Sequence, residues 1–397
     1  MSGLPSVRPI YLDHHATTPV DPRVLEAMLP YFSEKFGNPA SVNHAFGWEA
    51  AEAVEAARDQ VASLINADPR SVVFTSGATE ANNLALKGVI LASPPESHVI
   101  STNAEHRSVL DPLKRLARSG TQVTFLPVDS NGQVSAEQVE AELRLNTVLV
   151  SVIAASNEVG TINPIREIGA VCRARGVLFH SDAVQAASKI PVDLSELPVD
   201  LLSVSAHKLY GPKGVGALFV RRDGRRIAVE PLLHGGGHEQ RLRSGTLPVP
   251  LIVGFGEACR IASREMPEES ARLMTLRDRL WSGLCREIDG LMMNGHPVQR
   301  LPGNLNLSFE GVDGEALMTS LPGLAVSSGS ACTSADPEPS HVLRAMGRSD
   351  ALTRASIRFG LGRSTTAAEI DQAIEIVART VRRLRGQNVE TAGPNKG

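Results

Sequence analysis

Two charged side chains, Asp182 and Lys208, come soon after apolar segments that could hold them at the edge of a sheet. The apolar runs before them, Val177–His180 and Val199–Val204, are both of strand length. A carboxylate in such a place can bind a metal, act as a base or pair with a cationic nitrogen. A lysine in a partly buried setting has a lowered pKa and becomes a nucleophile toward carbonyl groups. The pair therefore indicates carbonyl chemistry at a shared site.

A third segment, Ser76-Gly77-Ala78-Thr79, lies between a strand-like run at Val72–Thr75 and a helical pattern at Thr79–Gly88. Free backbone N–H groups and the dipole at such a helix start form an anion site that suits a phosphate. Taken alone, the segment is also compatible with an ordinary capped helix. A phosphate site, a carboxylate and a lysine on successive loops are together what pyridoxal phosphate (PLP) requires. The carboxylate keeps the ring nitrogen of PLP protonated, and the lysine bonds to its aldehyde.

Strand-like runs and helical patterns alternate between residues 48 and 220. We expect strands at Val72–Thr75, His98–Ser101, Val123–Pro127, Val148–Ile153, Val177–His180 and Val199–Val204, and helices at Gly47–Asn66, Thr79–Gly88 and Leu110–Arg118. This alternation is typical of a mostly parallel sheet with helices on both faces, in which ligands bind at the carboxyl ends of the strands. Polar groups occupy those positions at 76–79, 105–106, 157–158, 182–185 and 205–208.

The character of the chain changes after Arg260. Longer helices are predicted at Glu268–Glu287 and Thr366–Leu384, with a strand around Asn304–Ser308, which indicates a second, smaller α+β domain. A length of 397 residues is suitable for two domains that share an interface. The tail, 386–397, is polar and contains Gly and Pro, so we expect it to be disordered.

Several segments together show a family resemblance. They are Tyr11-Leu12-Asp13, Ala16–Pro19, Phe36–Ser41, Phe74–Glu80, Ser205–Gly214, His234–Glu239 and Ser327–Ser334. On these segments the chain resembles a cysteine desulfurase of the NifS/IscS group, class V aminotransferases within the fold-type I PLP enzymes. The resemblance extends to about Leu384. It implies an α/β fold whose large domain, 16–262, carries a mostly parallel seven-stranded sheet, and a smaller α+β domain, 1–15 and 263–385, that carries the catalytic cysteine loop.

The resemblance also implies roles for individual residues. Lys208 is expected to bond to the PLP aldehyde and to move the Cα proton, Asp182 to pair with the ring nitrogen, and His106 to stack on the ring and assist proton transfer. Arg358 is expected to bind the substrate carboxylate through its planar guanidinium. Further expected contacts are the phosphate for Ala78, Thr79, Ser205 and His207, the ring oxygen and substrate for Gln185 and Asn157, and the substrate for Asn38. Thr246 is expected to reach the phosphate of a neighbouring subunit, which implies a homodimer.

Cys332 is surrounded by Ser, Gly, Ala and Thr, so its thiol is not expected to pack in a core. Loops on a rigid scaffold often carry function, although an isolated loop cysteine can be incidental. The resemblance implies that the Cys332 thiolate attacks the sulfur of bound L-cysteine and keeps it as a persulfide while alanine leaves. The sulfur would pass to iron–sulfur cluster assembly, or to tRNA thiolation, through a scaffold or other acceptor protein. Cys332 could also transiently ligate a cluster shared with that scaffold.

The composition argues against several other classes of protein. A net charge of −3 gives no basic face for direct binding of nucleic acid, and Met1–Asp13 lacks the apolar run of a secretory signal or membrane anchor. Cys172, Cys259 and Cys285 have no metal-ligand spacing, so no intrinsic metal site is expected. We expect these three cysteines to be reduced and to be small core residues, in a cytoplasmic protein.

Two histidine pairs lie outside this scheme. His14-His15 departs from the family pattern, and we interpret it as a polar turn at the active-site entrance. His234 and His238 flank three glycines, which oppose the helix that a zincin-type metal site needs. We expect that segment to form a loop near the cofactor.

Two kinds of alternative function remain open. One keeps the fold and cofactor, as in an aminotransferase, a kynureninase-like hydrolase or a selenocysteine lyase; the first two need no thiol at position 332. The other is a catalytically silent paralogue with a structural role, which predicts loss of Lys208, Asp182, His106 or Cys332, yet all four are present. A nucleotide-binding dehydrogenase would need a GxGxxG motif after the first strand, and the sequence has none there.

Overall fold

The computed structural model describes the backbone of residues 8–187, 189–222, 224, 226–328 and 339–391, and side chains as far as Gly386. The strands are β1 Ile10–Tyr11, β2 Val72–Thr75, β3 His98–Thr102, β4 Gln122–Leu126, β5 Thr147–Ser151, β6 Leu178–Asp182, β7 Leu201–Ser205, β8 Gly216–Val220, β9 Leu291–Asn294, β10 Asn304–Phe309, β11 Leu324–Ala325 and β12 Ser356–Gly360. The helices are α1 Pro22–Met28, α2 Pro30–Ser33, α3 Ala45–Leu64, α4 Ala78–Leu91, α5 Arg107–Ala117, α6 Ala136–Glu142, α7 Ile165–Ala174, α8 Val249–Glu287, α9 Gly314–Thr319, α10 His341–Ala345, α11 Asp350–Arg354 and α12 Ala367–Thr391. None of the helices in this described part is long and apolar enough to span a membrane.

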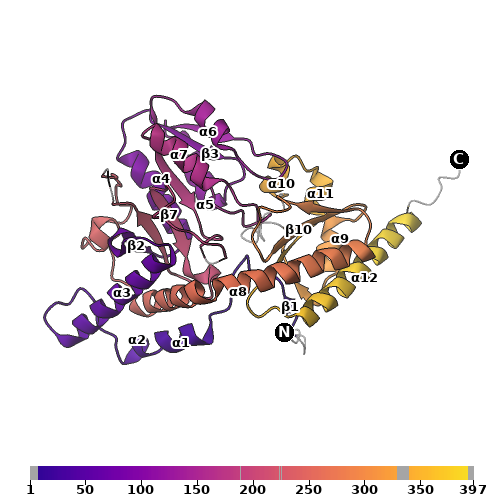
Figure 1. Cartoon of the computed structure of the whole chain (residues 1–397), viewed down its shortest axis with the longest axis horizontal. Helices are drawn as coiled ribbons and strands as arrows, with labels where there is room; N and C mark the ends of the chain where they lie inside the picture. The colour runs from indigo at the N-terminus through magenta and orange to yellow at the C-terminus, as the bar shows by residue number, and fades with distance from the viewer. Residues whose placement is uncertain (1–7, 188, 223, 225, 329–338, 392–397) are drawn as a thin grey trace.

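A seven-stranded sheet in the order β2-β8-β7-β6-β5-β3-β4 forms the centre of the larger part of the molecule (Figure 1). Strand β8 runs antiparallel to both of its neighbours, β2 and β7, and every other neighbouring pair is parallel. The mostly parallel sheet predicted from the alternation of strands and helices is therefore confirmed. All six predicted strands are present with ends shifted by two residues at most, whereas β8 was not singled out.

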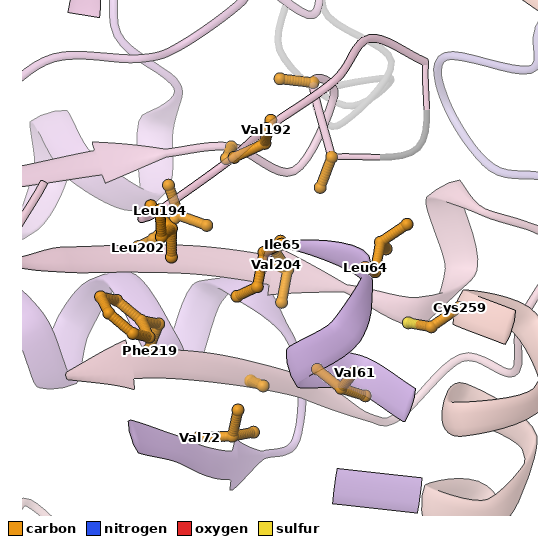
Figure 2. Close-up of a cluster of buried hydrophobic side chains, with 14 of the residues drawn as sticks. Val61, Leu64, Ile65, Val72, Val192, Leu194, Leu202, Val204, Phe219 and Cys259 are labelled. Carbon is orange, nitrogen blue, oxygen red and sulfur yellow. The ribbon is translucent and has the colours of Figure 1, made fainter. Parts of the chain in front are cut away.

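Helices cover both faces of this sheet because successive side chains of each strand point to opposite faces. Phe74 and Phe219 face the core beneath α3, α6, α7 and α8, whereas their neighbours Val73 and Leu218 face the core beneath α4 and α5. Figure 2 shows part of the first core. There the strand side chains meet α3 and α8 through Val72, Leu202, Val204, Phe219, Val61, Leu64, Ile65 and Cys259.

A second core lies against the antiparallel sheet β12-β10-β9, beside α12 and the second half of α8 (Figure 1). Helix α8 supplies Ile252 and Phe255 to the first core and Leu276 and Leu280 to the second. On this basis we propose that the two cores mark two domains. The predicted border at 262/263 falls inside α8, close to Pro267, which the helix accommodates.

The helix predicted at Glu268–Glu287 begins much earlier, at Val249. A proline within a helical pattern normally indicates a break, because it removes one backbone hydrogen bond and clashes with the preceding turn. Here packing of the first half of α8 against α3 and the sheet stabilises the continuous helix. Tertiary contacts thus override the local signal.

The N-terminal segment crosses to the C-terminal part of the chain. Strand β1 pairs in parallel with β11, and Asp13 forms a bridge with Gly360 of β12. The backbone N–H of Gly360 donates to the carbonyl of Leu12 at 2.7 Å, and that of His14 donates to the carbonyl of Gly360 at 2.9 Å. Residues 12–15 are thereby fixed beside β12.

Two sequence predictions about the C-terminal half are wrong. The tail was expected to be disordered from residue 386, but α12 continues through Thr391, since extending a formed helix costs little compared with starting one and no proline occurs between Ala367 and Thr391; residues 392–397 lie outside the described part of the chain. Cys285 was expected in a core and is exposed, because the buried stripe of α8 runs through Leu280 and Leu284. Cys172 and Cys259 are buried as predicted.

Candidate active site

A cavity of about 450 Å³ lies at the carboxyl ends of the central strands. Ten of the residues predicted from the sequence line it: Ala78, Thr79, His106, Asn157, Asp182, Gln185, Ser205, His207, Lys208 and Arg358. Asn38 and Thr246 are exposed and do not line it. Cys332 lies outside the described residues.

One end of the cavity is the start of α4. Gly77 is the N-cap and has a φ of +144°, a conformation that a side chain would strain, and no side chain caps the helix. The first backbone N–H groups of a helix have no partner within the helix, and its dipole makes that end positive. The carboxylate of Glu80, in the same turn, accepts a hydrogen bond from the Ser76 N–H at 2.8 Å and forms an ion pair with Arg243 at 2.9 Å, so its negative charge is compensated. This end is therefore suited to a phosphate.

His207 lines the same cavity and is neutral. Burial, followed by the charges of Lys208 and Lys213, lowers its pKa to about 4. Its Nδ1 is 3.1 Å from the Thr17 hydroxyl. The neutral imidazole of His207, the lysines Lys208 and Lys213 and the start of α4 line the same cavity. Together they form a polar, cationic wall against which an anion can bind.

The buried carboxylate of Asp182 is fixed by a hydrogen-bond network that starts on α4. The Asn82 side-chain amide donates one hydrogen to Asp182 Oδ2 and the other to Ser108 Oγ, both at 2.8 Å. The Val184 N–H donates to Asp182 Oδ1 at 3.1 Å. Each carboxylate oxygen thus accepts a hydrogen bond from a fixed donor, so the carboxylate has a defined orientation.

The same network fixes the tautomer of His106. The backbone N–H of Ser108 donates to His106 Nδ1 at 3.1 Å, so this nitrogen is an acceptor and the neutral ring carries its proton on Nε2. The Ser108 hydroxyl, 2.7 Å from Nδ1, donates to it as well. His106 is also the N-cap of α5, which holds the ring at the cavity wall.

Lys208 follows β7 on a short 3-10 turn and reaches the N-terminal segment. Its ammonium donates to the carbonyls of His15 and Ala16 at 2.6 and 2.5 Å. The Gln185 amide donates to the same His15 carbonyl at 2.9 Å, and Lys189 donates to the amide oxygen of Gln185 at 2.9 Å. Burial, and then the charge of Lys208, lowers the pKa of Lys189 to about 7.

Arg358 projects from β12 into the cavity, and only 1% of its side chain is exposed. Its Nη2 is paired with Asp13 Oδ1 at 2.8 Å, and its Nη1 donates to the carbonyl of Asn157 at 3.0 Å. Asp13 accepts a second hydrogen bond from the Ser327 hydroxyl at 2.8 Å. A buried charge must be paired in this way, because an unpaired one is strongly disfavoured.

Sequence reasoning missed several of these positioning residues. Asn82, Ser108, Asp13 and Lys189 orient the predicted side chains, yet each looks like an ordinary polar residue in the sequence. Glu105 belonged to a recognised polar loop, but its complete burial, which raises its pKa to about 8, was not foreseen. One signal was available for Asn82, since it lies one helical turn after the expected anion site.

One of the two histidine pairs differs from its interpretation, and the other lies in a loop as expected. His14 and His15 are buried rather than at a polar entrance, because two glycines of the C-terminal part, Gly360 and Gly362, leave room for their rings. His234 and His238 do not line the cavity, and His238 Nδ1 accepts from the N–H of Gly245 at 3.2 Å. Within the described ranges, no three His, Cys, Asp or Glu side chains are grouped as a metal site would require.

Comparison with known proteins assigns the family. The model of the class-V aminotransferase family matches residues 10–373. The chain belongs to this family. Among its curated relatives is a cysteine desulfurase IscS of Klebsiella pneumoniae, 54% identical over 95% of this chain and 94% of the relative. Another is a cysteine desulfurase IscS of Anaeromyxobacter, 55% identical over 95% of this chain and 93% of the relative.

Solved structures agree with this assignment for the class-V aminotransferase. A NifS-like protein superposes with a TM-score of 0.88 at 38% identity, covering 95% of this chain and 100% of that structure. The structure of SspA in complex with cysteine gives a TM-score of 0.79 at 39% identity, covering 88% of this chain and 98% of that structure. The predicted resemblance to the NifS/IscS group and the predicted fold-type I architecture are confirmed, and the family depends on PLP.

The cavity fits PLP on its own geometry. The uncapped start of α4 offers N–H groups to a phosphate, and Asp182 is held with both oxygens fixed. Lys208, at the end of the neighbouring strand, lines the same cavity. The three features derived from the sequence for this cofactor therefore lie in one place.

Asn82→Leu should weaken PLP binding, because it removes both amide hydrogen bonds and leaves the Asp182 carboxylate free to turn. A hydrogen bond to a charged group contributes about 1.5–3 kcal/mol, so we expect affinity to fall by about 10- to 150-fold. Titration of the cofactor-free protein with PLP, followed by absorbance, measures this affinity. Asn146→Leu makes the same change at an exposed position away from the cavity and should have no effect. Equal affinities for the two variants would contradict the role given to Asn82.

Proposed function

We propose that the chain is a PLP-dependent cysteine desulfurase, which converts L-cysteine to L-alanine and keeps the sulfur as a persulfide on Cys332. The observation that carries the proposal is one cavity that holds Lys208, the fixed carboxylate of Asp182, and the buried guanidinium of Arg358. The relatives described above, which are named as cysteine desulfurases, support the same reaction.

Each of these residues has a defined task on bound cysteine. Bound PLP would supply the electron sink next to the Cα of the substrate. Asp182 would keep the ring nitrogen protonated, and Lys208 would remove the Cα proton. Arg358 would hold the substrate carboxylate. His106, on the cavity wall, would assist proton transfer through its protonated Nε2.

The sulfur step balances without any other reactant. The Cys332 thiolate attacks the substrate sulfur, so that an S–S bond forms while the Cβ–S bond breaks. The electron pair of the broken bond stays with Cβ, which then takes up a proton. The products are L-alanine and an enzyme persulfide, whose outer sulfur an acceptor protein can remove. We propose that this acceptor is a scaffold for iron–sulfur cluster assembly, with tRNA thiolation as a further route.

A homodimer is part of this proposal. Several large apolar side chains are exposed near the N-terminus: Leu29, Phe32, Phe36, Phe46 and Trp48. The rings of Phe36 and Phe46 lie 5.4 Å apart between centroids, and exposed apolar side chains that gather in this way indicate an interface, which a second copy would cover. The exposed Asn38 and Thr246 would then be available to a neighbouring cavity. We also place the protein in the cytoplasm, where the free thiols of Cys172, Cys259 and Cys285 would stay reduced.

Phe32→Glu should weaken this homodimer, because it places a charge in the apolar surface. Light scattering on the purified PLP-loaded protein measures the mass, and we expect the wild type to elute as a dimer and the variant to shift toward a monomer. Leu145→Glu, at an exposed position on another part of the chain, is the control and should remain a dimer. A monomeric wild-type protein would contradict the proposed assembly.

The activity itself is tested by mixing the purified full chain with L-cysteine and a reductant. We expect yellow protein that produces L-alanine and sulfide in equal amounts. Pyruvate and ammonia in place of alanine, or alanine formed only from selenocysteine, would refute the proposed reaction. A colourless protein that cannot be loaded with PLP would refute the cofactor as well.

A further inference from the structure

The buried imidazole of His15 is not used by the proposed reaction. It lines the cavity, and only 1% of the residue is exposed. Neither ring nitrogen has a hydrogen-bond partner among the residues that the structure describes. Buried polar groups are nearly always hydrogen-bonded, so two unpartnered nitrogens on a cavity wall indicate a contact made by a bound molecule.

The backbone pairing places this ring beside Arg358. A Cβ added to Gly360 would lie 2.7 Å from His15 Nδ1, so the ring packs against the bare face of Gly360. Side chains two residues apart on a strand point to the same face, about 7 Å apart. Arg358 and Gly360 have this relation on β12, so the His15 ring and the Arg358 side chain lie on the same face of the strand, and the charge of Arg358 acts on the ring.

The charges around His15 favour an anion. Arg358, Lys189 and Lys208 all act on the ring, and burial together with these cations holds the pKa of His15 well below its usual range. The imidazole is therefore neutral and offers one N–H donor and one acceptor nitrogen. Two of the nitrogens of Arg358 already have partners, Asp13 and the Asn157 carbonyl, so a carboxylate bound there can use a further donor.

We propose that His15 is a second binding residue for the substrate carboxylate, donating its ring N–H to that group beside Arg358. The role deepens the proposed function and rests on it, since Arg358 must bind the same carboxylate. A neutral donor contributes direction without adding a further positive charge to those of Arg358, Lys189 and Lys208. The two residues together would select small amino acids over amines of the same size.

The test compares two ligands that differ only in the carboxylate, L-alanine and ethylamine. Their binding to the PLP-loaded protein is measured by the change in visible absorbance, without turnover. His15→Leu should weaken the binding of alanine by about 10-fold or more, as expected for a lost hydrogen bond to a charged group, and should leave that of ethylamine unchanged. His15→Gln, which keeps an N–H donor, should recover part of the loss. His14→Leu is the control, because His14 is equally buried but does not line the cavity.

The outcomes separate this inference from the proposed function. Equal changes for alanine and ethylamine in His15→Leu, or no change in either, would overturn the inference while leaving the desulfurase reaction intact. If Arg358→Leu binds alanine as the wild type does, the carboxylate site itself has been misassigned. His15→Ala provides the same comparison with a smaller side chain if His15→Leu does not fold, as judged by its circular dichroism spectrum.

Discussion

Lys208→Ala should lose the yellow absorbance of lysine-bound PLP and lose turnover by at least about 1,000-fold, because both the covalent link and the proton carrier are removed. The cofactor should still bind, since the start of α4 and Asp182 are unchanged. A visible spectrum and an alanine assay on the same preparation measure both effects.

Lys213→Ala is the matched control for this prediction. Lys213 lines the same cavity and follows Lys208 by five residues, so its loss changes the charge of the cavity by the same amount. We expect this variant to stay yellow and to turn over cysteine. A yellow, active Lys208→Ala protein would remove Lys208 from the mechanism and leave Lys213 as the candidate.

Cys332→Ser should keep the yellow colour and bind L-cysteine, yet release no sulfide above the background without enzyme. A hydroxyl cannot accept the substrate sulfur as a thiolate does, so neither the S–S bond nor alanine should form. Mass spectrometry of the wild type after one turnover should show one added sulfur atom, absent from the variant.

Cys285→Ser provides a control for the chemistry of an exposed thiol. Cys285 lies on α8 and does not line the cavity. We therefore expect full turnover and the added sulfur on Cys332. Sulfur carried by Cys285 in the wild type, or normal turnover by Cys332→Ser, would mean that the persulfide forms at another cysteine.

The parts of the fold that local patterns encode were predictable. Strands such as β6, predicted at Val177–His180 and observed at Leu178–Asp182, followed from apolar runs, and the rule that ligands bind at the carboxyl ends of parallel strands placed nine side chains in one cavity. Arg358, on the antiparallel strand β12, was assigned only through the family resemblance. Strand β8 and the full length of α8 were not predicted. The reversed direction of β8, and the tolerance of α8 for Pro267, both depend on packing against distant elements.

The positioning residues were hidden for a related reason. Asn82 touches Asp182 across 100 residues of chain, and Asp13 pairs with Arg358 across 345. A single sequence records residue types along the chain, whereas these contacts depend on the path that returns residues 12–15 to β12. The same path explains why His14-His15 was taken for an exposed turn.

The return of the N-terminus to β12 has a consequence for how the protein is made on the ribosome. Asp13 is synthesised 345 residues before its partner Arg358, about 20 to 70 s at ordinary elongation rates. The central strands β3 to β8 can pair during that interval, whereas residues 12–15 have no strand to dock on. A nascent or truncated chain that ends before β12 therefore lacks its carboxylate site. Under the proposed function, sulfur transfer would therefore begin only after β12 has been synthesised and has paired with residues 12–15.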